Sequence, residues 1–156
     1  MLDRQMDSVP LTHKFKYTKD ASWGIVLNIS AEIVNNDDVS QMTHKVNNMI
    51  TLCINNPMLN SENQKFILLN SEIEWLIRGL KMVSDQAAMA ISSPINVCVR
   101  SIDIAECDYQ EEGLACCIAE WLGKKLNFQV PTVPISYCRE QNRYVFEFPN
   151  HIYDTE

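Results

Sequence analysis

Glycine is scarce in this sequence, and so are the motifs that depend on it. The chain holds four Gly in 156 residues, and none stands in a phosphate-binding loop or a dinucleotide-binding fingerprint. The three His are scattered, and no two of them have the short spacing of a zinc site. We therefore expect no cofactor and no bound metal.

Positive charge is also in short supply. Thirteen Lys and Arg stand against 20 Asp and Glu, which gives a formal net charge of −7. Binding to nucleic acid or to an acidic membrane surface depends on clustered cations, so we expect neither. No apolar run approaches the roughly 18 residues of a membrane span, and the opening MLDRQMD lacks the features of a signal peptide. The sequence predicts a cytoplasmic protein.

The composition is typical of one folded domain. Apolar residues make up 46% of the chain and charged residues 21%, and this length is enough to bury a core without metals or disulfides. Six Cys are too few for a disulfide scaffold in a chain of this size, so we expect reduced thiols. We predict a single domain over residues 1–156, with residues 1–13 and 150–156 mobile.

Alternating apolar residues predict strands near both ends of the chain. Phe15 and Tyr17 alternate with lysines, and every second residue of 25–33 is apolar, which predicts a hairpin. Residues 133–137 and 144–148 also alternate, and the polar loop between them predicts a C-terminal hairpin.

A further strand is predicted after Pro94. The apolar residues at 95, 97 and 99 alternate, but those at 102 and 104 have the opposite parity. A bulge near Arg100 to Ser101 would reconcile the two sets, and so would a strand covered on both faces.

Apolar spacings of three and four predict helices. One such stripe runs from Val39 to Cys53 behind a cap at Asp37 or Asp38, and Asp108 with Glu111 forms a capping-box pattern ahead of a helix that ends near Lys125.

Residues 58–92 allow two interpretations. One is a long helix capped by Ser61 with Gln64; the other is a short buried run, Lys65 to Leu69, before a helix capped by Ser71 with Glu74. We favour the first because the apolar stripe continues through Ser71, and leave open whether residues 65–69 are a strand. Together these elements predict an α+β fold with three helices packed on a largely antiparallel sheet.

Five carboxylates lie within ten residues at the predicted junction of strand and helix, with no Lys or Arg between them. They are Asp103, Glu106, Asp108, Glu111 and Glu112. Such a cluster suits a divalent cation site, a pair of acid and base carboxylates, a docking patch for a basic protein, or the solvated start of a helix. We favour the docking patch, because complementary charge steers association. We add three candidate partner-binding residues. Trp23 lies at the start of a predicted strand, and Arg139 and Arg143 lie at the tip of the predicted C-terminal hairpin.

No arrangement of Cys, His or Ser has the local pattern of a catalytic site, so we expect no catalytic residues. The sequence favours a non-enzymatic binding module, such as the immunity protein of a bacterial toxin or an antitoxin, that neutralises a basic, nuclease-like protein by direct binding. Two alternatives stay open. One is a small metal-dependent hydrolase that uses Asp103, Glu106 and Asp108 with Cys107, and the other is an assembly subunit or homodimer.

Overall fold

The computed structural model of this chain describes residues 10–19, 22–35 and 41–154. Its centre is a mixed five-stranded sheet in the order β1-β2-β7-β4-β3. The strands are β1 (Leu11–Tyr17), β2 (Ile25–Val34), β3 (Met42–Lys45), β4 (Ile50–Ile54) and β7 (Ile95–Ile104). β4 and β7 are parallel, whereas β1 with β2, β2 with β7 and β3 with β4 are antiparallel. The sheet is therefore largely antiparallel, as predicted.

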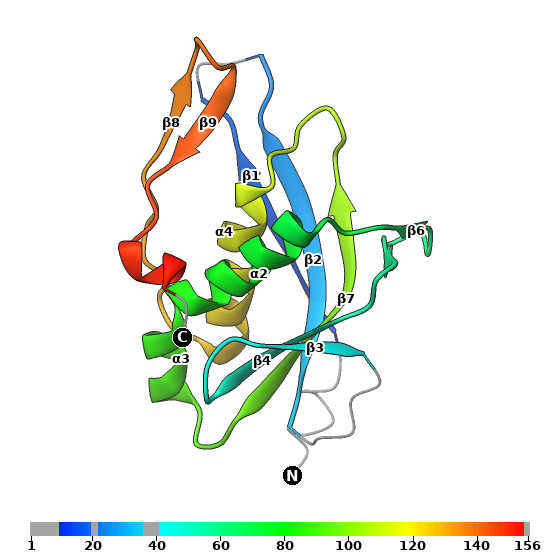
Figure 1. The fold of residues 1–156 in the computed structure, drawn as a ribbon, viewed down its shortest axis with the longest axis vertical. Helices are drawn as coiled ribbons and strands as arrows, with labels where there is room; N and C mark the ends of the chain where they lie inside the picture. Colours follow the sequence, from blue (N-terminus) through cyan, green and yellow to red (C-terminus); the bar gives the residue numbers. More distant parts are fainter. Residues whose placement is uncertain (1–9, 20–21, 36–40, 155–156) are drawn as a thin grey trace.

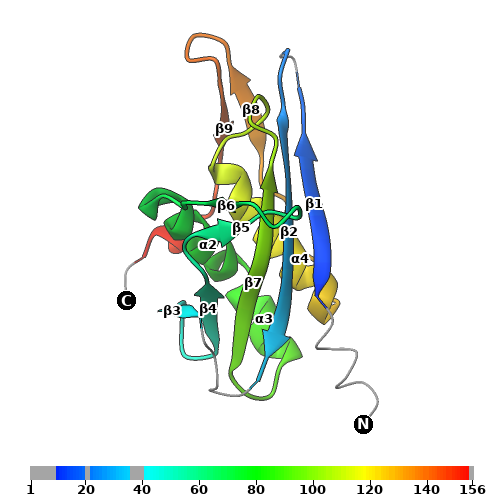
Figure 2. The same cartoon turned by 90° about the vertical axis from the view of Figure 1, so that its right-hand side faces the viewer.

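The helices α2 (Asn70–Met82), α3 (Ser84–Ala90) and α4 (Glu112–Leu126) lie on one face of the sheet (Figures 1 and 2). α4 contacts β1 and β2, and α2 packs on α4. The odd-numbered residues of β2 from Ile25 to Ala31 are fully buried beneath α4, and Leu76, Leu80 and Trp121 extend this core. The even-numbered residues of β2 lie on the other face of the sheet, which the helices leave uncovered.

Two small hairpins flank the sheet. β5 (Met58–Leu59) pairs with β6 (Lys65–Phe66), and this hairpin crosses the helix-free face (Figure 2). β8 (Ile135–Cys138) pairs with β9 (Arg143–Phe146) at one end of the molecule, next to the turn between β1 and β2 (Figure 1). The predicted α+β domain with a C-terminal hairpin is confirmed.

Of the two explanations left open for the change of parity in residues 95–104, the bulge near Arg100 is present. The register between β2 and β7 shifts between Ser30, which faces Ser101, and Ala31, which faces Val99. Arg100 is therefore the extra residue. The Val99 carbonyl oxygen accepts a hydrogen bond from the buried Gln41 side chain at 3.0 Å, so the backbone group that the bulge diverts still has a partner.

The helix predicted from Val39 to Cys53 is wrong where the chain is described. Residues 42–54 form the hairpin of β3 and β4, while Asp37, Asp38 and Val39 lie outside the described residues. The Asn47 side chain accepts the backbone N–H groups of Met49 and Ile50 at 2.8 and 2.9 Å, which closes the turn. β4 is buried on both faces, and a short strand of this kind cannot be distinguished from a helix by its apolar spacing.

The favoured long helix over residues 58–92 is wrong as well. Residues 65 and 66 belong to β6, α2 begins only at Asn70, and the helix is interrupted at Val83 before α3. Asn60 accepts the backbone N–H groups of Glu62 and Gln64 at 2.9 and 3.0 Å, and such side-chain bonds compete with helix formation. The cap position is Leu69 rather than Ser61 or Ser71.

The other boundaries differ in smaller ways. α4 begins at Glu112, because Asp108 accepts a hydrogen bond from the Gly24 N–H at 3.0 Å and does not cap the helix. Of the ends expected to be mobile, residues 11–13 are part of β1, and Asn150–Tyr153 form a short 3-10 helix with Ile152 buried in the core. Residues 1–9, 155 and 156 lie outside the described residues.

Gly79 lies at a close contact between α2 and α4. A Cβ atom at this position would lie 2.3 Å from the Ala115 carbonyl oxygen and 2.7 Å from the Ala115 Cα. Alanine is the better helix former by about 1 kcal/mol, but these contacts are with backbone that cannot turn aside. We expect Gly79→Ala to lower the free energy of unfolding by about 1 to 3 kcal/mol, measured by urea denaturation. The exposed Ala88 in α3 supplies the control, because Ala88→Gly should cost only about 0.5 to 1 kcal/mol. A Gly79→Ala protein as stable as the parent would contradict this packing.

Candidate functional site

The predicted acidic cluster lies along the end of β7 and the connection to α4, and most of its carboxylates bind other parts of the chain. Asp103 Oδ1 accepts the Ser61 N–H at 2.8 Å. Asp108 accepts the Gly24 N–H, and Glu111 Oε2 accepts the Ser71 hydroxyl at 3.2 Å. These three carboxylates therefore hold the β5–β6 turn, the start of β2 and the start of α2 in place.

Glu112 and Arg143, both predicted to bind a partner, form an ion pair with each other. Next to this pair, the Gln110 side chain donates to the Tyr144 carbonyl oxygen at 2.6 Å and accepts the Tyr144 N–H at 2.9 Å. The contacts attach β9 to the start of α4. Arg143 therefore holds the hairpin in place and is not a free cation at its tip.

The Trp23 side chain packs against the β8–β9 hairpin. Its Nε1 donates to Asn142 Oδ1 at 3.0 Å, and its ring lies 5.0 Å from Tyr144 and 6.5 Å from Tyr137 between centroids. Arg139, at the tip of the same hairpin, is exposed, and its side chain has no partner within the described ranges of the chain. Trp23 fixes the hairpin, whereas Arg139 stays available to a partner.

Glu106 differs from the other four carboxylates. It is exposed and forms no hydrogen bond or ion pair with any residue that the structure describes. Glu106 lines a hollow of about 330 Å³, which Phe66, Ile102 and Ile104 line with apolar atoms. Asn60, Gln64 and Lys65 complete the lining. An unpaired carboxylate thus stands beside an apolar depression.

Two large apolar side chains project from the adjoining segment. Ile67 is 64% exposed and Leu69 is 58% exposed. The backbone between them is held by Asn56, which accepts the Leu68 N–H at 2.9 Å and donates to the Leu68 carbonyl oxygen at 3.1 Å. The segment leads from the hollow at Phe66 to Ser71, which contacts Glu111. We call Phe66, Ile67, Leu69, Ile104 and Glu106 the acidic-apolar surface.

A buried carboxylate fixes the end of this surface. Glu72 is 7% exposed, and it accepts the Leu69 N–H at 2.8 Å and the Tyr109 hydroxyl at 2.6 Å. Burial and the hydrogen bond to Glu72 raise the pKa of Tyr109 above its ordinary value, so this phenol remains a donor at neutral pH. The pair ties the start of α2 to the acidic connection, so Leu69 projects from a constrained backbone.

The sequence did not identify Ile67 and Leu69 as surface residues, because the favoured long helix placed them on or beside its buried stripe. The signal for exposure lies in Asn56 and Asn60, whose side chains turn the chain before and after β5. Asparagine is common where a side chain replaces a regular backbone partner.

The described residues offer few groups suited to chemistry. They contain no set of three or more His, Cys, Asp and Glu side chains that could hold a metal ion. Burial raises the pKa of the Cys116 and Cys117 thiols, which disfavours the reactive thiolate.

None of the helices in the described part of the chain is long and apolar enough to cross a bilayer.

The chain was compared with protein-family models, with curated proteins and with solved structures, and no match was found in any of the three.

Proposed function

We propose that this chain is a protein-binding module that docks a basic protein partner on the acidic-apolar surface. The observation that carries the proposal is the exposure of Ile67 and Leu69 on a constrained segment. That segment follows Phe66, which lines the same hollow as Glu106, a carboxylate without a partner among the described residues. Large apolar side chains rimmed by charge are typical of interface anchors, because their burial on binding stabilises the complex while the charges select the partner.

The Glu106 carboxylate and the apolar lining of the hollow, which also includes Lys65, favour a Lys or Arg side chain from the partner. The aliphatic part of such a side chain packs on Phe66 and Ile104, and its charged head meets Glu106. Asp103, Asp108 and Glu111 add negative potential from nearby, and the whole chain carries a net charge of −7. Complementary charge of this kind accelerates association and makes it sensitive to salt.

The finer proposal is a cognate inhibitor that acts in the cytoplasm, of the immunity-protein or antitoxin type. Such a protein neutralises a basic, nuclease-like toxin by covering its active surface, which needs complementary charge and fast association but no chemistry of its own. The internal hydrogen bonds of Asp103, Asp108 and Glu111 do not favour the hydrolase alternative, since these carboxylates already have partners.

The test compares variants of the acidic-apolar surface for binding to a partner. The tagged chain is used to retrieve its partner from the source cells, and the purified partner is then titrated by calorimetry at low and high salt. We expect Glu106→Lys and Ile67→Asp each to weaken binding by at least about tenfold, which corresponds to about 1.4 kcal/mol. Glu106→Lys should also reduce the salt dependence.

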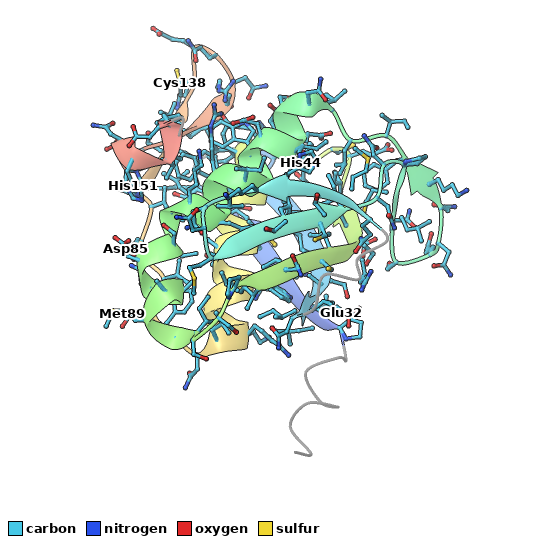
Figure 3. All side chains as sticks on the ribbon, turned by 60° about the horizontal axis from the view of Figure 1, so that its bottom comes forward. Glu32, His44, Asp85, Met89, Cys138 and His151 are labelled. Atoms are coloured by element: carbon cyan, nitrogen blue, oxygen red, sulfur yellow. The ribbon has the colours of Figure 1, made fainter. Side chains whose placement is uncertain are left out.

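The matched controls lie on α3. Asp85→Lys reverses an exposed charge and Met89→Asp replaces a side chain that is 91% exposed, both far from the β5–β6 hairpin (Figures 1 and 3). These variants should bind like the parent. Equal affinity of all four variants would show that the interface lies elsewhere. If the chain alone is a dimer and Ile67→Asp makes it a monomer, the surface binds a second copy of the chain instead.

A further inference from the structure

Cys53 and Cys98 face each other on the helix-free face of the sheet. They are register partners on the parallel strands β4 and β7, and the neighbouring pair, Leu52 and Val97, points into the core. Paired strands lie about 4.8 Å apart, within the range of about 4.4 to 6.8 Å between the Cα atoms of a disulfide. The other four cysteines have no such arrangement: Cys116 and Cys117 are adjacent on α4, Cys138 faces Arg143, and Cys107 lies in a loop.

Both thiols are buried, at 0% and 1% exposure, but unlike Cys116 and Cys117 they lie near polar side chains that include a cation. Arg100 lies two residues beyond Cys98 on β7. Its guanidinium donates to Glu32 Oε2 at 2.5 Å and to Gln41 Oε1 at 2.8 Å. The side-chain hydrogen bond from Cys53 lowers the pKa of Cys98, and Arg100 acts in the same direction against the opposing effects of burial and Glu32. The same contact raises the pKa of Cys53. The contact between the two sulfurs therefore favours the loss of one proton from the pair, and a single thiolate is the reactive form in thiol oxidation.

We propose that Cys53 and Cys98 are a redox pair that peroxide converts to a disulfide between β4 and β7. The Cys98 sulfur attacks one peroxide oxygen, the O–O bond breaks, and the products are a sulfenic acid on Cys98 and one water. The Cys53 sulfur then attacks the Cys98 sulfur, the S–O bond breaks, and a second water leaves. The protein loses two electrons and two protons, and the peroxide is reduced to two waters.

The experiment oxidises the folded full-length chain with hydrogen peroxide, blocks the remaining thiols with N-ethylmaleimide, and maps the linked peptides by mass spectrometry. A Cys107→Ser, Cys138→Ser background removes the two less buried thiols, which could link separate molecules. We expect a Cys53–Cys98 peptide to become the main oxidised product, with two fewer blocked thiols per chain, and dithiothreitol to restore both. The same treatment in urea shows which disulfides the unfolded chain forms.

Two single variants separate the roles of the thiols. With Cys53→Ser, oxidation should stop at a sulfenic acid on Cys98, which dimedone labels, whereas with Cys98→Ser residue 53 should stay unlabelled. The mapping on the folded background chain decides the matter even where a variant fails to fold. Absence of the Cys53–Cys98 peptide from the folded chain, or its appearance only in urea, would overturn the proposal.

Discussion

Replacing Tyr144 by alanine is expected to release the β8–β9 hairpin and to lower the free energy of unfolding by about 3 to 5 kcal/mol. Tyr144 is fully buried, and its ring centroid lies 5.5, 5.0 and 5.1 Å from those of Tyr17, Trp23 and Tyr137. Its hydroxyl donates to the Trp23 carbonyl oxygen at 2.6 Å and accepts the Lys19 N–H at 3.2 Å. One residue therefore joins both strands of the hairpin to the β1–β2 turn.

The control for this prediction is Tyr144→Phe, which keeps the ring and removes the hydroxyl. We expect it to cost about 1 to 3 kcal/mol, the range for a buried polar group left without its partner. Urea denaturation measures both variants. If Tyr144→Ala cost no more than Tyr144→Phe, the aromatic contacts would not be what holds the hairpin.

Trp121→Ala is the second change with a large expected effect, about 3 to 5 kcal/mol. Trp121 is fully buried in α4, and its Nε1 donates to the Leu11 carbonyl oxygen on the edge strand β1 at 2.7 Å. The variant loses a large side chain from the core and leaves the Leu11 oxygen without its donor. For a domain of this size, such a loss lowers the midpoint of thermal unfolding by roughly 6 to 20 °C.

Trp75 provides the comparison for Trp121. Its ring is only partly buried, between Phe148 and Tyr153 on the outer side of α2, so the cavity left by Trp75→Ala opens to solvent. We expect Trp75→Ala to destabilise the domain clearly less than Trp121→Ala, measured by the same thermal scan. If both variants lowered the midpoint of thermal unfolding equally, the core would not centre on Trp121.

The parts of the fold predicted correctly are those with strict alternation. The β1–β2 and β8–β9 hairpins follow from alternating side chains, which is a local property. The bulge at Arg100 was one of two explanations for a change in that alternation. β4 was misassigned because Cys53 is buried on the face of the sheet that the helices leave open, so the strand is apolar on both sides. A strand of this kind carries no alternation to detect.

The candidate site was predicted in part. What the sequence could not predict is which side chains pair across large distances along the chain. The sequence shows that Asp108 lies among carboxylates, but its partner Gly24 is 84 residues away along the chain. Trp23 and Asn142 are likewise 119 residues apart. Charge density can be counted in a sequence, but the pairing of the acidic cluster depends on the folded topology. Of its five carboxylates, Glu106 is the one without a partner among the described residues.

The central position of β7 has a consequence for the order in which the chain folds. The β1–β2 and β3–β4 hairpins each form from neighbouring segments, but β7 pairs with β2 on one side and β4 on the other. The two hairpins therefore become one sheet only after about 100 residues have been synthesised, and the parallel closure with β4 brings together residues 45 positions apart. Because such distant contacts slow folding, we expect the insertion of β7 to be the rate-limiting step. A conservative core substitution such as Val97→Ala should slow folding more than Val46→Ala, which changes a buried residue in the β3–β4 hairpin.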